Sequence, residues 1–309
     1  MEQAVQIIII GIINYHLLIR RHLTELTLIA IAVIWALNFS IVKIALSEID
    51  AFGFNALRYI LAAALLIGYT KWLGLNLLPR REDFWPMVGI GIVGNLIYQV
   101  MFISGLDRTN AANAAVILGT IPVWVAFLSH IFTNEKLNRA KSIGITLAFG
   151  GVLLIIFGRN GAFSISTKSA IGDIITLGSA IAWASYTIMS KKYLKIYTTV
   201  QFTGFMSLIG VIGIVSIGIP SLVETDFSKI SAGAFSGILY SGVLSIGLSY
   251  LIWNRAINKI GAIKTAAYQN LVPVLGLLFG VIILGENLGL IQYVGSFFVI
   301  IGIVSTQAR

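Results

Sequence analysis

The side chains of this sequence that could do chemistry are amide and aromatic groups that interrupt long apolar runs. A polar group in hydrocarbon costs free energy unless it faces a cavity or a neighbouring helix. Ten such residues are candidates for contact with a small-molecule substrate: Trp35, Asn38, Tyr98, Gln99, Asn113, Trp183, Tyr186, Trp253, Tyr268 and Gln269. Because these groups can hydrogen bond and stack, the sequence predicts a cavity that binds a small molecule.

The spacing of these candidates places several of them on shared helix faces. Trp35 and Asn38 lie three residues apart, and Trp183 and Tyr186 repeat that spacing 148 residues later. Residues three or four apart share one face of a helix, so both pairs are expected to line a central cavity. Two alternatives stay open: the tryptophans can serve packing or the membrane interface, and Gln99 can serve a hydrogen bond between helices.

The groups that catalysis or metal binding would need are scarce. The chain has no cysteine and three histidines. It also lacks an H-E-x-x-H pattern and an Asp at the centre of an apolar run. Nucleophile and base pairs, paired carboxylates and metal clusters all require such residues. We therefore expect no enzyme activity, no catalytic residue, no metal and no cofactor.

The composition points to an integral membrane protein. Of 309 residues, 58% are hydrophobic and 11% are charged, and the mean hydropathy is +0.94. This leaves too little polar surface for a soluble protein of the same length. Ten stretches approach the roughly 20 apolar residues that a membrane-spanning helix needs. The expected fold class is an all-α membrane protein with ten transmembrane helices, whose partner is the lipid bilayer and whose assembly is a monomer or weak homodimer.

The net charge of +9 does not indicate a nucleic-acid partner. A nucleic-acid surface would gather its Lys and Arg on one folded face, whereas here they stand at the ends of apolar runs. No nucleic acid is therefore expected to bind.

The stretch from residue 105 to 158 recurs 151 residues later without a gap. Each copy reads as an apolar helix with one central proline, a short polar hinge with one glutamate, and a glycine-containing apolar helix. The matching landmarks are Ala111 and Ala262, Ala115 and Ala266, Pro122-Val123 and Pro273-Val274, Glu135 and Glu286, and Gly151 and Gly302. The chain is therefore an internal duplication.

The form of this repeat, A-x-x-x-A-x-x-x-x-x-x-P-V followed by [GN]-E-x-L, resembles the EamA-type family of the drug/metabolite transporter superfamily. The likeness extends over nearly all of residues 26–307 and includes Trp35-Ala-Leu-Asn38 and Trp183-Ala-Ser-Tyr186. The resemblance implies a substrate-filled central cavity with alternating access. It is compatible with export of amino acids or related metabolites, with drug efflux, or with uptake of small solutes.

We divide the chain into a segment at 1–25 that lies in the membrane interface, a first repeat at 26–158, a linker at 159–169 and a second repeat at 170–309. The expected spans are 26–46, 52–72, 84–105, 111–133, 140–158, 170–190, 200–219, 233–254, 262–284 and 288–307. Five spans per repeat is an odd number, so the second repeat must enter the membrane from the other side. The repeats are expected to be inverted.

The distribution of basic residues predicts the orientation. With a cytoplasmic N-terminus, the inner segments hold fifteen Lys and Arg residues against four in the outer segments, Arg108, Arg159, Lys168 and Lys229. This excess predicts a protein of the cytoplasmic (inner) membrane with both termini in the cytoplasm.

Two basic residues and two glutamates need separate interpretation. A charge at the centre of a span costs roughly 2.5–3.5 kcal/mol, so Lys43 and Arg58 are expected near the outer interface, where Arg58 could pair with Glu48 or Asp50. Glu135 and Glu286 are expected to cap or hinge the adjoining helices, because each carboxylate stands at the N-terminus of the span that follows it.

The expected function is transport of a small metabolite, either an amino acid or a related neutral or zwitterionic solute, or else drug efflux. The alternatives are a sugar-phosphate or nucleotide-sugar exchanger and a membrane scaffold that transports nothing. The exchanger would need Lys or Arg in the cavity, for which Lys43, Arg58 and Lys191 are the candidates.

Overall fold

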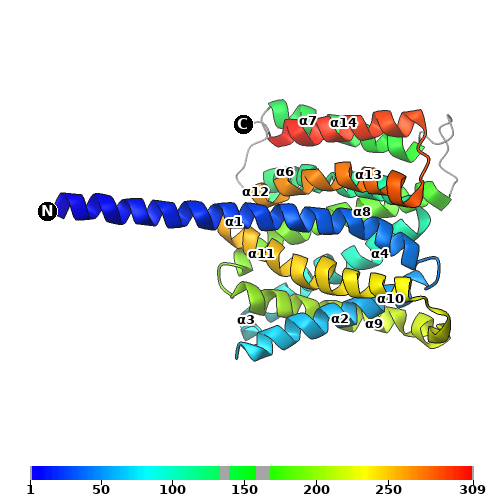
Figure 1. The fold of residues 1–309 in the computed structure, drawn as a ribbon, viewed down its shortest axis with the longest axis horizontal. Helices are drawn as coiled ribbons and strands as arrows, with labels where there is room; N and C mark the ends of the chain where they lie inside the picture. Colours follow the sequence, from blue (N-terminus) through cyan, green and yellow to red (C-terminus); the bar gives the residue numbers. More distant parts are fainter. Residues whose placement is uncertain (1, 133–138, 158–167, 308–309) are drawn as a thin grey trace.

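The computed structural model describes residues 2–132, 139–157 and 168–307, and within these ranges it contains helices and no strands. Most helices run along one common axis and form a bundle (Figure 1). The first half contains α1 (Glu2–Ala45), α2 (Ala51–Trp72), α3 (Arg81–Gly91), η1 (Ile92–Ile97), α4 (Tyr98–Arg108), α5 (Ala111–Leu118), α6 (Ile121–Phe132) and α7 (Arg139–Phe157). The second half contains α8 (Lys168–Tyr193), α9 (Thr199–Glu224), η3 (Phe227–Lys229), α10 (Ala232–Leu239), η4 (Tyr240–Leu248), α11 (Ser249–Ile260), α12 (Ala262–Ala267), η5 (Tyr268–Asn270), α13 (Leu271–Leu284) and α14 (Leu290–Gln307).

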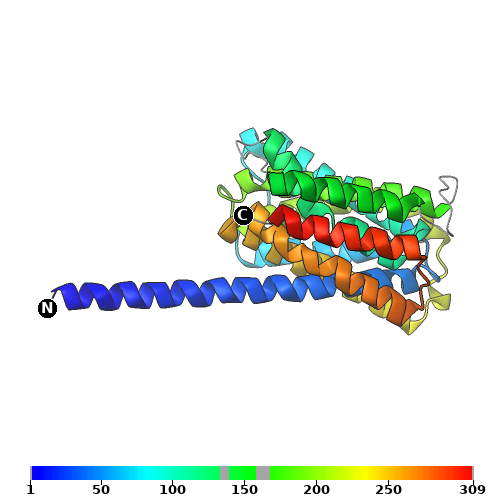
Figure 2. The same cartoon turned by 90° about the horizontal axis from the view of Figure 1, so that it is seen from above.

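Each of the ten predicted spans has a helix or a run of helices in the structure, so the predicted fold class is confirmed. Among the described residues, eight helical stretches are long and apolar enough to cross a membrane. The other two spans are α7 and α14, which hold shorter apolar stretches at 142–155 and 290–302 and lie side by side (Figures 1 and 2). Spans 3, 4, 8 and 9 are composed of two or three consecutive helical pieces each.

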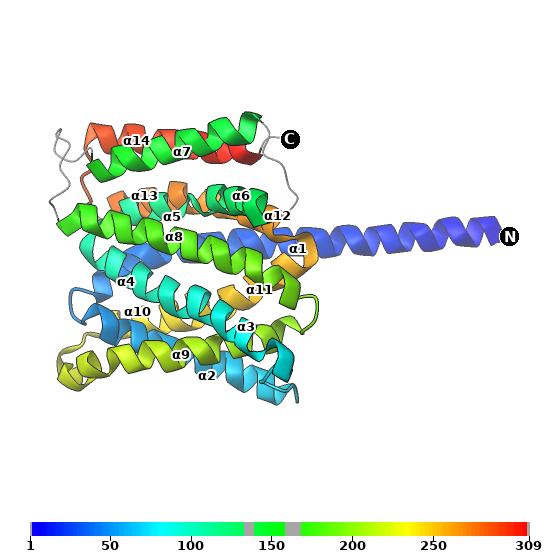
Figure 3. The ribbon, with the colours of Figure 1, turned by 180° about the vertical axis from the view of Figure 1, so that it is seen from behind.

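The two halves are inverted. The N- and C-termini lie at the same end of the bundle, here called the terminal end (Figures 1 and 3). Helix α1 runs away from this end, whereas α8, the first helix of the second half, runs towards it. The connections after α1, α4, α9 and α13 lie at the other end, here called the opposite end. Corresponding helices therefore cross the bundle in opposite directions.

The N-terminal segment does not form the separate helix that we predicted. It is continuous with the first span in α1, a helix of 44 residues, about 66 Å long at 1.5 Å per residue. No proline or glycine follows Gly11 in α1, so nothing in the sequence ends the helix before residue 26. Figure 2 shows α1 extending beyond the bundle. Whether residues 2–22 lie in a membrane interface stays a prediction, and Glu135 and residues 159–167 of the predicted linker lie outside the described residues.

The halves meet through small residues in α5 and α13. A methyl group added at Gly119 would come within 2.6 Å of the Pro273 ring, and one added at Gly276 would overlap Ala115. Helices in lipid associate by close packing because there is no hydrophobic gain between them, so small residues at this contact set the distance between the halves.

Two acidic residues at the opposite end accept hydrogen bonds at the N-termini of helices. The Asp50 carboxylate caps α2 by accepting from the N–H groups of Phe52 and Gly53, and it also accepts from the Ser221 hydroxyl at 2.6 Å. The backbone N–H and hydroxyl of Ser231 donate to Glu48 at 2.7 and 2.8 Å and hold the pKa of that carboxyl below its ordinary value. Neither carboxylate is therefore available to an arginine inside the bundle.

Glu286 caps a helix, but not the one that we predicted. Its two carboxylate oxygens accept from the N–H groups of Ala111 and Ala112, at 2.6 and 2.8 Å, at the start of α5 in the other half. The expected partner was the start of α14, which follows Glu286 in the chain. A carboxylate at a helix N-terminus satisfies free N–H groups and meets the positive end of the helix dipole. Glu286 therefore ties the two halves together at the opposite end.

Candidate functional site

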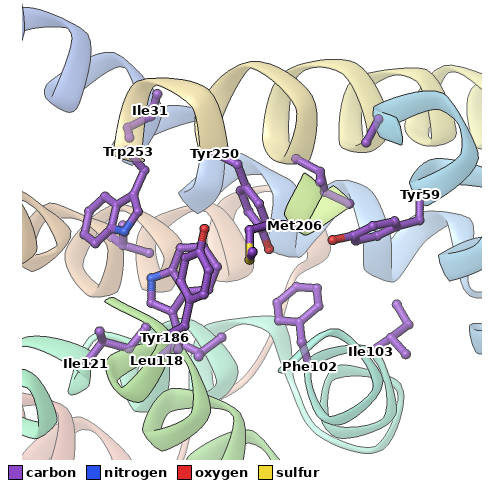
Figure 4. Close-up of a cluster of buried hydrophobic side chains, with 14 of the residues drawn as sticks. Ile31, Tyr59, Phe102, Ile103, Leu118, Ile121, Tyr186, Met206, Tyr250 and Trp253 are labelled. Carbon is purple, nitrogen blue, oxygen red and sulfur yellow. The ribbon is translucent and has the colours of Figure 1, made fainter. Parts of the chain in front are cut away.

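A cavity of about 40 Å³ lies between the two halves. That volume holds a few water molecules. Its walls are made by Trp35, Asn38, Phe39, Arg58, Tyr98, Gln99, Phe102, Leu118, Ile121, Ser245, Ile246, Tyr250, Gln269 and Val272. Figure 4 shows a cluster of buried side chains that includes Phe102, Leu118, Ile121 and Tyr250 of this wall, with Tyr250 and Trp253 extending from α11 towards Tyr186 and Phe102 of other helices.

Equivalent residues of the two repeats meet in and beside this cavity. Gln99 Nε2 lies 2.5 Å from the Tyr250 hydroxyl, and the two residues are separated by the repeat distance of 151. Trp35 and Trp183, which occupy matching positions in the first span of each half, contact edge to face with ring centroids 6.1 Å apart. A contact between equivalent residues must lie on the axis that relates the repeats, so the pseudo-twofold axis passes through the site.

An aromatic cluster forms one side of the site. The Trp183 ring lies 4.7 Å from Tyr98, 4.8 Å from Tyr250 and 6.0 Å from Trp253 between centroids. Trp35 packs on Trp253 at 5.4 Å and donates its indole N–H to the Ser245 carbonyl at 2.9 Å. These rings provide apolar faces for a solute, and such faces bind cations as well as apolar groups.

Several polar atoms at the site have no hydrogen-bond partner within the described part of the chain. They are Asn38 Oδ1, Gln269 Oε1, Trp183 Nε1 and Trp253 Nε1, and all four side chains are buried. A buried polar atom without a partner costs free energy and needs an explanation, such as a ligand or an ordered water. The two amide oxygens can accept hydrogen bonds from a solute in the cavity.

Our prediction that Arg58 lies near the outer interface and pairs with Glu48 or Asp50 is wrong. Arg58 is 1% exposed, lines the cavity and donates to Asn55, Gln99 and Ser241. It stands seven residues into α2, about 10 Å along the helix from its start. Neutral acceptors from three helical segments stabilise the guanidinium there, which the apolar sequence around it did not reveal.

Lys43 lies in the last turn of α1, at the opposite end of the bundle, and binds backbone carbonyls. Its ammonium group donates to the carbonyls of Leu106 and Asp107, at 2.8 and 3.0 Å, at the end of α4. A cation at the C-terminus of a helix satisfies free carbonyls and meets the negative end of the dipole.

Two π-helical segments occur at matching places in the repeats. η1 comprises residues 92–97 and η4 comprises residues 240–248, and a shift of 151 places 92–97 on 243–248 within η4. π-helical turns are rare and often mark functional sites. Here η4 supplies the Ser245 carbonyl that accepts from Trp35 and the Ser241 hydroxyl that accepts from Arg58. The irregular turn thus links the second half to both α1 and α2.

Five of the ten predicted site residues line the cavity: Trp35, Asn38, Tyr98, Gln99 and Gln269. Trp183 and Trp253 stand next to it, in ring contact with Trp35. This arrangement does not test substrate binding, which stays a prediction for all ten residues.

The other three predicted residues do not line the cavity, although Tyr186 packs on Trp183. Asn113 faces α14, where Gln292 donates to its side-chain oxygen at 3.2 Å. The Tyr186 hydroxyl bonds to Asn254, and Tyr268 lies half-buried in η5. Asn113 and Tyr186 therefore have protein partners that explain their polarity.

The sequence analysis named Arg58 as a cavity candidate only under the exchanger alternative, and it missed Tyr250. Tyr250 could have been found because it is the repeat equivalent of Gln99. For Arg58 the available signal was a cation within an apolar run. Among the residues that the structure describes, no three His, Asp or Glu side chains gather where they could hold a metal ion.

The comparisons with known proteins agree with this geometry. The model of the EamA-like transporter family matches residues 22–157 and 170–306. YyaM, an uncharacterized transporter of Bacillus subtilis (strain 168), is 27% identical over 284 residues, which cover 91% of this chain and 92% of YyaM. A WAT1-related protein of Arabidopsis thaliana, At1g44800, is 25% identical over 277 residues, which cover 80% of this chain and 74% of that protein. A solved crystal structure shares the fold with a TM-score of 0.66 at 16% identity, over 91% of this chain and 95% of the other.

Proposed function

The chain belongs to the EamA-like transporter family and is a multi-pass membrane transporter, and from this premise we propose that it moves a small metabolite by alternating access. The observation that carries the proposal is the cavity between two inverted halves, where the equivalent residues Gln99 and Tyr250 meet. Inverted repeats place a site at their interface and open it to one side of the membrane at a time. The protein's role is binding and movement of the solute without chemical change.

The proposed cycle includes a movement of the two halves against each other. Inverted repeats open their central site to one side of the membrane at a time by separating at one end. Glu286 bridges the halves at the opposite end. The proposed motion therefore includes breaking and remaking this contact.

Orientation can be tested by labelling. We propose that the terminal end faces the cytoplasm, because the basic residues concentrate there. The chain has no cysteine, so a single cysteine at Lys168 or Lys229 is a clean reporter for the opposite end. In intact cells both are expected to react with a membrane-impermeant maleimide, whereas a cysteine at Lys71 or Lys192 reacts after lysis only. The reverse pattern would contradict the proposed orientation.

The transport role can be tested with cavity variants. Purified protein is first screened for thermal stabilisation by amino acids and other small metabolites, since a ligand at 100 times its Kd stabilises by about 2.7 kcal/mol. The stabilising solute is then followed by counterflow into proteoliposomes. Asn38→Ala and Gln269→Ala are expected to lower its flux at least about tenfold, which corresponds to about 1.4 kcal/mol per lost interaction.

Gln292→Ala is the matched control, because this buried amide bonds to Gly289 and Asn113 away from the cavity. Its flux should stay within about twofold of the parent protein at equal reconstitution. Equal flux in all three variants would refute the cavity as the path. Specific binding without any flux would instead favour a scaffold that transports nothing.

A further inference from the structure

The charge of Arg58 is not neutralised within the described part of the bundle, and two of its N–H groups have no acceptor there. Its Nε donates to Asn55 at 2.9 Å, Nη1 to the Ser241 hydroxyl at 2.9 Å and Nη2 to Gln99 Oε1 at 2.6 Å. A guanidinium group has five N–H donors, so two are left. All three acceptors are neutral. The group therefore has both free donors and a full uncompensated charge at the wall of the cavity.

No carboxylate balances this charge within the described ranges, where the ion pairs involve other residues. The nearest rings are those of Phe54 and Phe102, whose centroids lie 5.5 and 5.1 Å from the guanidinium carbon. Aromatic faces attract a cation but do not neutralise it. In a site with little water an uncompensated cation interacts strongly with an anion, because the effective dielectric constant is low.

The internal duplication shows that the fold does not need this arginine. The two repeat distances seen in the site, 148 and 151 residues, place the counterpart of Arg58 at Met206 or Ile209. Both are apolar, and α9 packs against η1 as α2 packs against η4. A residue required by the architecture of the repeat should recur in both copies. Arg58 breaks the symmetry, as a residue for an asymmetric solute must.

Further polar groups of the cavity have the opposite preference. Asn38 Oδ1 and Gln269 Oε1 are buried acceptors without partners among the described residues. Both residues line the cavity, and an amide oxygen accepts hydrogen bonds from N–H or O–H groups. The cavity thus combines one charged donor with two acceptors.

From this arrangement we infer that the cavity binds its solute through a single carboxylate, which pairs with the free N–H groups of Arg58. Asn38 and Gln269 accept hydrogen bonds from donor groups elsewhere on the same solute. A carboxylate fits the planar fork of an arginine. A phosphate dianion would require a second cation, and Lys43 is occupied at the carbonyls of Leu106 and Asp107. This inference rests on the proposed function, because it assigns the solute class of the same cavity.

Matched acid and amide probes test the inference on the unmodified protein. The thermal stability of the purified protein is measured in 3-phenylpropionate and in 3-phenylpropionamide, which differ in charge while sharing a ring for the aromatic wall. The acid is expected to bind about 10- to 100-fold more tightly, since hydrogen bonds to charged groups contribute more than neutral ones. L-Phenylalanine and phenyl phosphate are the additional arms. Tighter binding of L-phenylalanine than of 3-phenylpropionate identifies the ammonium group as the donor for the amide oxygens.

Two substitutions assign the effect to Arg58. Arg58→Met is expected to abolish the preference for the acid over the amide, and Arg58→Lys to keep the preference with weaker binding, because the charge stays but the fork is lost. Lys43→Met is the matched control, since it removes a cation outside the cavity, and it should keep the full preference. If Arg58→Met fails to fold, Arg58→Lys and the probe pair decide the outcome.

The inference is overturned if acid and amide stabilise the protein equally, if no carboxylate probe stabilises it at millimolar concentration, or if phenyl phosphate binds more tightly than both acids. Because these measurements concern binding, they separate the two proposals. An acid preference without flux in proteoliposomes removes the proposed transport and keeps the carboxylate site. Flux of a neutral solute without an acid preference removes the carboxylate site and keeps the proposed transport.

Discussion

Gly94→Ala is expected to destabilise the protein severely, by about 3 kcal/mol or more. An added methyl group at this position in η1 would overlap the Tyr186 ring, which is fully buried and bonded through its hydroxyl to Asn254. Overpacking a tight core costs about 1–3 kcal/mol and more where the neighbour cannot move. The variant should melt at a clearly lower temperature in detergent and lose its monodisperse elution peak.

Gly89→Ala is the control in the same span, because nothing lies within 4 Å of the added methyl group. It should match or exceed the parent protein in stability, since alanine favours a helix over glycine by about 1 kcal/mol. A double variant tests whether steric overlap with the Tyr186 ring is the cause of the lost stability. If Tyr186→Leu is already present, adding Gly94→Ala should cost much less than it does alone. Equal costs in both backgrounds would disprove the overlap as the reason.

Glu286→Ala is expected to open the opposite end of the bundle. The carboxylate accepts two backbone N–H groups of α5 from the other half, and hydrogen bonds to charged groups contribute about 1.5–3 kcal/mol each. Loss of about 2–3 kcal/mol shifts a closed-to-open equilibrium at least tenfold. A cysteine at Leu118, which lines the cavity and is 4% exposed, should then react with a soluble maleimide at least about tenfold faster in purified protein.

Glu48→Gln is the control for this substitution. It also removes a carboxylate from the opposite end, but Glu48 is exposed and bonds to Ser231 outside the contact between α5 and the second half. In Glu48→Gln the cysteine introduced at Leu118 should react with the maleimide at an unchanged rate. Unaltered labelling in Glu286→Ala as well would show that Glu286 does not hold the halves closed.

The sequence could predict the spans because hydrophobic length decides them directly. A run of about 20 apolar residues has few alternatives to a membrane helix, and the displacement of Glu135 and Pro122 by 151 residues in Glu286 and Pro273 revealed the duplication. An odd number of spans then requires inversion. The break at residue 26 was predicted from hydrophobicity alone, although no helix-breaking residue stands there, and α1 is continuous.

The partners of individual side chains could not be predicted in the same way. Glu286 was assigned to the helix that follows it, because sequence proximity cannot show that the start of α5 lies closer. Arg58 was assigned to the interface from the average cost of a charge in lipid, which ignores the three neutral acceptors that the fold brings to it. In both cases the decisive contacts join residues more than 40 positions apart, which are Ser241 and Gln99 for Arg58 and Ala111 for Glu286. The amides Asn38 and Gln99 were found because their helical spacing is local information.

The contacts between equivalent residues have a consequence for the mechanical cycle. In a transporter whose two halves exchange conformations, each contact is replaced by its symmetry-related copy. A contact between equivalents, such as Gln99 with Tyr250 or Trp35 with Trp183, is its own copy. We therefore expect these pairs to persist through the cycle. Contacts between non-equivalent positions, such as Glu286 with Ala111, are expected to be replaced by their counterparts in the other half. In the proposed cycle we therefore expect Tyr250, Gln99 and the two tryptophans to stay in contact while the two ends of the bundle open in turn.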